Sequence, residues 1–72
     1  MADPVKLFTK PGCPHCFNAK RDFDTREVEY VEYNVREDKD ALAEMLALNG
    51  GRRRVPTIAD GDSVTVGFKG GY

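Results

Sequence analysis

The two cysteines of this 72-residue chain, Cys13 and Cys16, are separated by only two residues. Thiols at this spacing on one helical turn can join as a disulfide and separate again as a dithiol. As a structural crosslink, the pair would close too short a loop to constrain the unfolded chain much. The spacing therefore indicates thiol–disulfide exchange.

We expect Cys13 to be the attacking thiol and Cys16 the resolving thiol. Pro14 is favoured at the first position of a helix, which places Cys13 at the N-cap. There its sulfur faces unpaired backbone N–H groups and the positive end of the helix dipole, and both stabilise a thiolate. When Cys13 is joined to a substrate sulfur, Cys16 attacks Cys13 and releases the reduced product.

His15, the only histidine, lies between the cysteines. It can donate a hydrogen bond to a thiolate or add positive charge when protonated. Either effect stabilises the reduced form and makes the disulfide a stronger oxidant. We therefore expect His15 to tune the thiolate, together with Pro14. The alternative is a histidine that points into solvent.

The remaining residues predict one domain, residues 1–72, with the element order β-α-β-α-β-β, because so short a chain supports only one small core. The predicted strands are residues 5–9 (ending at Phe8 or Thr9), 28–35, 55–59 and 63–66, and the predicted helices run from Pro14 onward and over residues 36–48. Asp38 is the expected cap of the second helix. The charged residues of the second strand are typical of a sheet edge.

Pro56 is the second informative residue. Proline inside a central strand would remove a ladder hydrogen bond, so we expect it at the start of the third strand. If the Val55–Pro56 bond is cis, the Val55 backbone can pair with an extended substrate beside the cysteines. An ordinary trans proline at the strand start is the alternative.

Charge and hydropathy exclude several functions. The formal net charge is −1, which argues against a general nucleic-acid binder. There is no apolar run long enough to span a bilayer, and the first residues lack the pattern of a secretory signal. We expect a cytoplasmic monomer without membrane or nucleic-acid partners, in a compartment where thiols are kept reduced.

Motifs follow one another along nearly the whole chain: Thr9-Lys10-Pro11-Gly12-Cys13-Pro14-His15-Cys16, then Val55-Pro56-Thr57-Ile58, then Asp60-Gly61 and Gly67. This combination resembles the glutaredoxin family. The resemblance implies an α/β, thioredoxin-like fold with a four-stranded mixed sheet of strand order 2-1-3-4 and flanking helices. It also implies that Pro56 is cis.

The same resemblance implies a small oxidoreductase that reduces protein disulfides or glutathione mixed disulfides, with glutathione as co-substrate and no tightly bound cofactor. Lys10 is implied to attract the glycine carboxylate of glutathione, and Val55 to pair its backbone with the glutathione cysteine. A basic residue just upstream is implied to assist Lys10. We predict Arg54 for this role, and Arg52 and Arg53 are the alternatives. His15, Pro56, Gly67 and Phe68 complete the implied contacts.

The chain departs from the family pattern in three ways. His15 stands where tyrosine is usual, and proline followed by histidine is similar to the disulfide-introducing oxidases of the bacterial periplasm. The redox potential is therefore expected above the glutaredoxin range of roughly −200 to −230 mV. The segment from Gly67 lacks the groups that hold the γ-glutamyl end of glutathione, although N–H groups at residues 70–71 could contact an anion. We expect the last helix of the family to be absent or a stub.

The ending Gly67-Phe68-Lys69 is similar to a glutaredoxin-like subgroup that binds glutathione poorly, takes electrons from thioredoxin reductase and feeds ribonucleotide reductase. The tryptophan usual in that subgroup is missing. Glutathione reductase and thioredoxin reductase therefore both remain as electron sources.

Two other functions, metal binding and non-catalytic binding of an acidic partner, have weaker support in the sequence. A metal site at Cys13, His15 and Cys16 would lack the further ligands that zinc usually takes. A binding module using the arginines at 52–54 would rest on a short basic cluster in an acidic chain.

Overall fold

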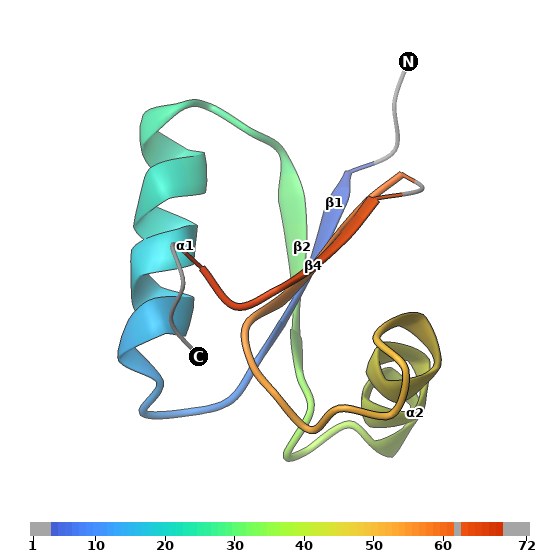
Figure 1. Cartoon of the computed structure of the whole chain (residues 1–72). Coiled ribbons are helices and arrows are strands. Elements are labelled where there is room, and N and C mark those ends of the chain that lie inside the picture. The colour runs from blue at the N-terminus through green and yellow to red at the C-terminus, as the bar shows by residue number, and fades with distance from the viewer. Residues whose placement is uncertain (1–3, 62, 69–72) are drawn as a thin grey trace.

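The computed structural model describes residues 4–61 and 63–68 and shows a four-stranded sheet between two helices (Figure 1). The elements are β1 (Val5–Thr9), α1 (Pro14–Thr25), β2 (Tyr30–Asn34), α2 (Lys39–Leu48), β3 (Thr57–Asp60) and β4 (Ser63–Val66). The sheet order is β2-β1-β3-β4. Strand β1 runs parallel to β2 and antiparallel to β3, so the predicted mixed sheet is confirmed.

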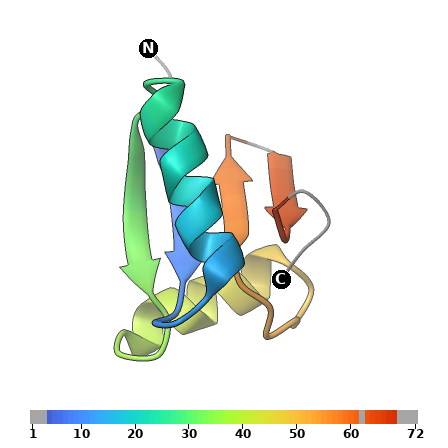
Figure 2. The same ribbon diagram turned by 90° about the vertical axis from the view of Figure 1, so that its left-hand side faces the viewer.

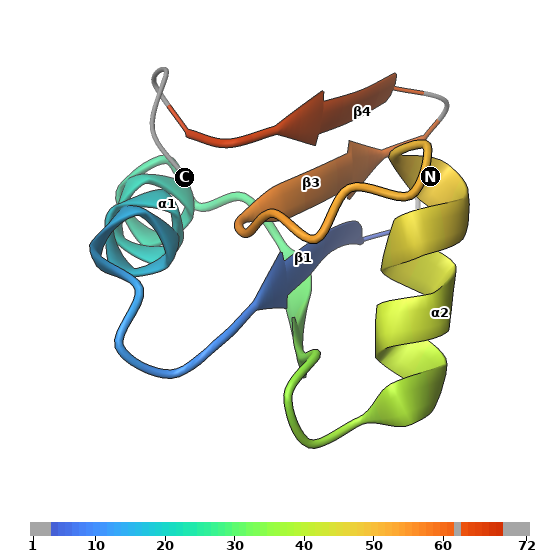
Figure 3. The same ribbon diagram turned by 60° about the horizontal axis from the view of Figure 1, so that its bottom comes forward.

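The two helices cover opposite faces of the sheet. Figure 2 shows α1 lying across one face, and Figure 3 shows α2 on the other side of the strands. Successive side chains of β1 point to opposite faces, so Leu7 packs toward α1 and Phe8 toward α2. The cluster on the α1 face contains Val5, Leu7, Ala19 and Phe23, and the larger second cluster contains Phe8, Cys16, Val35, Ala41, Met45, Val55 and Ala59.

Two predicted elements, the second strand and the second helix, were too long. Strand β2 occupies 30–34 rather than 28–35, because the Val28 N–H closes the end of α1 on the Phe23 carbonyl at 2.8 Å. Helix α2 begins at Lys39 rather than residue 36. The side chain and carbonyl of Asn34 accept hydrogen bonds from the N–H groups of residues 36–38, which hold that segment in a turn.

Strand β3 begins at Thr57, one residue after Pro56, rather than at Val55. The predicted cap of α2 is confirmed, since the Asp38 side chain accepts from the Ala41 N–H at 3.1 Å. The predicted edge position of β2 is confirmed as well. The expectation of an absent or stub-like last helix falls on residues 69–72, outside the described residues.

The loop from α2 to β3 is fastened by one buried side chain, Asn49. Its Nδ2 donates to the Arg52 carbonyl at 2.7 Å and to the Thr57 hydroxyl at 3.2 Å, and its Oδ1 accepts from the Arg52 N–H at 2.9 Å. Gly51, at φ 87°, reaches back to donate to the Leu46 carbonyl at 2.8 Å. These bonds set the path of the loop that carries Val55 to the edge where β1 leads into α1.

Within residues 4–61 and 63–68, neither helix combines the length and apolarity needed to cross a bilayer.

Replacing Asn49 with Ala should lower the free energy of unfolding by roughly 2 kcal/mol, because three hydrogen bonds are lost at a buried position. Urea denaturation monitored by circular dichroism measures the change. The matched control is Asn18→Ala, which removes an exposed asparagine and should stay within roughly 0.5 kcal/mol. Equal effects of the two substitutions would contradict the role of Asn49.

Candidate active site

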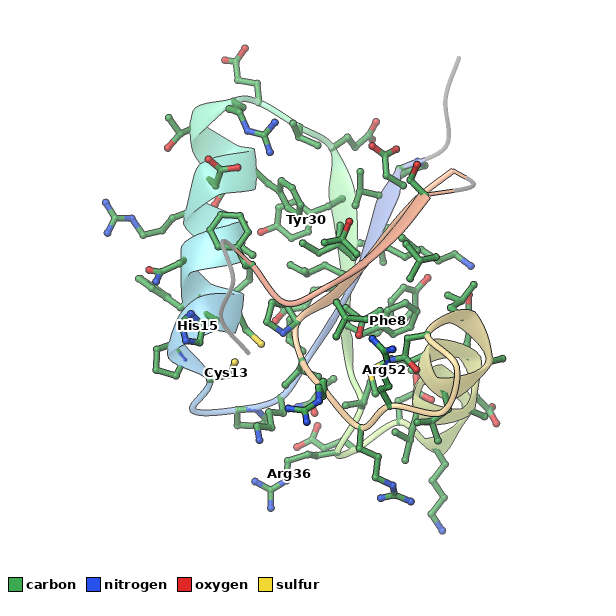
Figure 4. All side chains as sticks on the ribbon, in the orientation of Figure 1. Phe8, Cys13, His15, Tyr30, Arg36 and Arg52 are labelled. Carbon is green, nitrogen blue, oxygen red and sulfur yellow. The ribbon has the colours of Figure 1, made fainter. Side chains whose placement is uncertain are left out.

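Cys13 is the N-cap of α1, as predicted, with an extended backbone at φ −92° and ψ 110°. The Cys16 N–H donates to its sulfur at 3.3 Å, and the Cys13 thiol donates to the Val55 carbonyl at 3.8 Å. Both cysteines are free thiols, and Figure 4 shows Cys13 at the end of α1 where the chain enters the helix. The sulfur therefore lies at the start of α1, between the Cys16 N–H and the Val55 carbonyl.

Cys16 lies in a different environment, with 2% of its surface exposed. Burial, followed by the hydrogen bond with Cys13, raises the pKa of the Cys16 thiol from 9.0 to about 12. A backbone hydrogen bond from Lys10 acts in the opposite direction, while negative charge on Cys13 and Glu32 adds to the rise. The half-buried thiol at the N-cap and the buried thiol behind it therefore suit different steps of an exchange reaction.

The Val55–Pro56 bond is cis, as the resemblance implies, and Pro56 is fully buried. Within residues 4–61 and 63–68, neither the N–H nor the C=O of Val55 makes a backbone hydrogen bond. Since the Val55 carbonyl already faces the Cys13 sulfur, a segment bound along Val55 would lie directly beside the attacking thiol.

A basic cleft lies beside Val55. Three cations line it, Lys10 from the loop after β1, Arg36 from the turn after β2 and Arg53 from the loop before β3, and none of the described lining residues is acidic. Val35, Leu42 and Met45 are its apolar lining. In Figure 4, Arg36 lies at the same edge of the molecule as Cys13. An anionic group could bind here.

Arg53 is therefore the member of the arginine cluster that the structure brings beside Lys10 and Val55. Arg54, which we named from the sequence, is exposed, and its carbonyl accepts from the Thr57 hydroxyl at 2.8 Å. Sequence reasoning missed Arg36. Its position just after the second predicted strand, at the sheet edge that the cysteine loop also occupies, was the available signal.

A second cleft borders the cysteines on the β2 side. It is lined by Thr9, Lys10, Pro11, Gly12, Cys13, Pro14, Cys16, Phe17, Asn18, Lys20, Glu32 and Asn34. The buried Thr9 hydroxyl donates to the Glu32 carboxylate at 2.8 Å, and the Lys20 ammonium lies 3.2 Å from the same carboxylate. Phe17 is 56% exposed at the rim. Sequence reasoning did not identify Glu32.

His15 lies in the first turn of α1 and lines a third depression with Asn18, Arg21, Asp22, Thr25 and Phe68. In the described part of the chain, no hydrogen bond joins His15 to either sulfur. Phe68 packs on the α1-face cluster, and the Gly67 N–H donates to the Pro56 carbonyl at 2.7 Å. The roles of these three residues stay predictions. Residues 70–71, with their proposed anion contacts, lie outside the described residues.

Among residues 4–61 and 63–68, no group of three histidine, cysteine, aspartate or glutamate side chains could hold a metal ion.

Comparison with known proteins gives a consistent result. The family model for glutaredoxins matches residues 5–64. A glutaredoxin of Neisseria meningitidis is 38% identical over 65 residues, which cover 89% of this chain and 75% of that protein.

Two solved structures bear on the chemistry. The glutaredoxin-like protein NrdH-redoxin from Escherichia coli, described as having a thioredoxin-like activity profile, has a TM-score of 0.82 at 25% identity, covering 93% of this chain and 86% of that one. A buckwheat glutaredoxin in complex with glutathione has a TM-score of 0.72 at 27% identity, covering 89% and 60%. The thioredoxin-like fold is thereby established.

The raised pKa of Cys16 predicts that the reduced protein loses stability in alkali. A pKa raised in the folded state stabilises the fold below the ordinary value of 9.0, and this contribution disappears as the pH rises toward about 12. The unfolding free energy of the reduced protein, measured by urea denaturation under reductant, should therefore fall more steeply across this range than that of Cys16→Ala. Burial also raises the pKa of Tyr30, but Tyr30 is present in both proteins, so its contribution cancels in the comparison. Parallel curves would contradict the prediction.

Proposed function

Because the chain belongs to the glutaredoxin family and is therefore a thiol–disulfide oxidoreductase, we propose that glutathione is its co-substrate. The observation that carries this proposal is the basic cleft of Lys10, Arg36 and Arg53 next to Val55. Glutathione is a short extended peptide that carries a carboxylate at its glycine end. The cleft offers cations for that carboxylate, and Val55 offers a backbone N–H and C=O for the central cysteine.

In the proposed cycle, the Cys13 thiolate attacks the glutathione sulfur of a mixed disulfide. The Cys13–glutathione bond forms and the substrate's thiol leaves as a thiolate, which takes up a proton. A second glutathione then attacks the glutathione sulfur held by Cys13, producing glutathione disulfide and the Cys13 thiolate. For protein disulfides, Cys16 attacks Cys13 instead, so that the enzyme ends as the Cys13–Cys16 disulfide and the protein substrate as a dithiol.

A second electron source, thioredoxin reductase, is favoured by a specific observation. The similar Escherichia coli protein is described as having a thioredoxin-like activity profile. In this chain Phe68 packs on the α1-face cluster, and neither Gly67 nor Phe68 is among the described residues that line the two clefts beside Cys13. The γ-glutamyl end of glutathione would then gain little from this segment. For this candidate we propose weak glutathione binding and, from the resemblance of the Gly67-Phe68-Lys69 ending to the subgroup, ribonucleotide reductase as the electron acceptor.

For either electron source, we propose that the protein acts as a monomer in the cytoplasm, where reduced glutathione and the reductases are present.

Activity with glutathione and glutathione reductase, measured on a glutathionylated peptide, tests the main proposal. Arg53→Ala should raise the KM for that peptide by roughly 3- to 10-fold with little change in kcat, because it removes binding that the ground and transition states share. Arg52→Ala makes the same charge change on a neighbour that does not line the cleft, and should leave KM near its original value. Equal effects would contradict the cleft. Activity with thioredoxin reductase alone would favour the second candidate.

Cysteine substitutions separate the two thiols. Cys13→Ser should abolish turnover of both substrate types, because it removes the attacking sulfur. Cys16→Ser should retain turnover of the glutathionylated peptide, since glutathione can resolve that intermediate, but should lose protein disulfide reduction. Insulin disulfide reduction and the coupled glutathione assay measure the two activities. Activity in Cys13→Ser would overturn the assignment of the attacker.

A further inference from the structure

The cleft on the β2 side of the cysteines contains a carboxylate that the proposed cycle does not use. Glu32 lies on β2 opposite Leu7 of β1, on the sheet face that α1 covers. Thr9, at the end of β1, donates its buried hydroxyl to this carboxylate, and Lys20 of α1 lies beside it. Three elements thus hold one carboxylate in the cleft that Cys13 and Cys16 also line.

The resolving step creates a need for such a group. Cys16 must lose its proton as its sulfur attacks Cys13, yet it is almost completely buried. Burial, the largest cause of its raised pKa, persists when Cys13 is joined to a substrate sulfur, so the Cys16 thiol still holds its proton near neutral pH. A thiol held this firmly in its protonated form reacts faster if a nearby base takes the proton during the attack.

We infer that the Glu32 carboxylate is the proton acceptor for Cys16 when Cys16 resolves a mixed disulfide on Cys13. The inference rests on the dithiol cycle proposed above. The proton passes to a Glu32 oxygen directly or through one water in the cleft, the Cys16–Cys13 bond forms, and the bond from Cys13 to the substrate sulfur breaks. The substrate leaves as a thiolate, and Glu32 returns its proton to solvent through the cleft.

The surroundings of Glu32 suit this role. The Thr9 hydroxyl donates to one carboxylate oxygen, and the side chain of Glu32 keeps 38% of its surface exposed, so a proton that it accepts can pass on to solvent. The Lys20 ammonium, 3.2 Å from the same oxygen, holds the carboxylate from the α1 side. The titratable groups lining this cleft among the described residues are Lys10, Cys13, Cys16, Lys20 and Glu32, so Glu32 is the carboxylate there.

A purely electrostatic role of Glu32 predicts the opposite effect. Its negative charge disfavours the Cys16 thiolate, so a variant without that charge would have more thiolate and resolve faster. The proton-acceptor role predicts slower resolution. The sign of the change therefore distinguishes the two roles.

Single-turnover reaction of the reduced protein with dithiobis(nitrobenzoic acid) measures this sign. Attack by Cys13 releases a first thionitrobenzoate, and resolution by Cys16 releases a second one in a step independent of reagent concentration. Glu32→Gln should slow the second phase by roughly 10- to 100-fold near neutral pH and leave the first phase nearly unchanged. The deficit should shrink as the pH rises, because hydroxide then removes the Cys16 proton.

Two further measurements exclude a merely structural effect. Glu32→Ala should be slow in the same phase and accelerated by added acetate, which can replace the missing carboxylate. Thr9→Val should show an intermediate slowing, because it removes the hydroxyl that positions Glu32. A second phase that is unchanged or faster in Glu32→Gln would overturn the inference, as would a slow phase that does not respond to pH or acetate. Loss of the first phase in the unmodified protein would instead overturn the proposed cycle.

Discussion

Every interaction at the site depends on how the chain passes from β1 into α1. Strand β1 is central, paired with β2 on one side and β3 on the other, so its end is fixed relative to both neighbours. Gly12, at φ 77°, reverses the chain, and Cys13 then caps the helix with its sulfur held by the Cys16 N–H. The attacking thiol is thereby placed in the cleft on the β2 side and against Val55, which lines the basic cleft.

Structural features that depend only on neighbouring residues could be predicted from residue type alone. Pro14 after Cys13 predicted the start of α1, Asp60-Gly61 predicted the hairpin between β3 and β4, and Asp38 predicted the cap of α2. Each of these residues has a backbone preference or a side-chain acceptor that acts within a few positions of itself. The cis Val55–Pro56 bond required the family resemblance, because the proline is compatible with either isomer.

The parts of the site that sequence reasoning missed depend on strand register. Glu32 belongs to a predicted strand, residues 28–35, that carries charged and aromatic residues on both faces, and a shift of one residue would move Glu32 to the α2 face. Only the register that pairs Glu32 with Leu7 places the Glu32 carboxylate beside Thr9 and Lys20. Arg36 and Arg53 likewise come from segments far apart in sequence that meet at one edge of the sheet. No local sequence pattern specifies which distant segments will lie together in the folded chain.

The two clefts beside the cysteines differ in charge: the basic cleft has no acidic residue among its described lining, whereas the cleft on the β2 side holds Glu32 together with Lys10 and Lys20. The basic cleft is open, so its cations attract an anionic substrate toward Cys13. An unpaired carboxylate on the other side would repel both that substrate and the Cys13 thiolate. Lys20, 3.2 Å from the Glu32 carboxylate, offsets part of that repulsion. At short range the Glu32 oxygens still accept hydrogen bonds, which is the property that proton transfer from Cys16 requires.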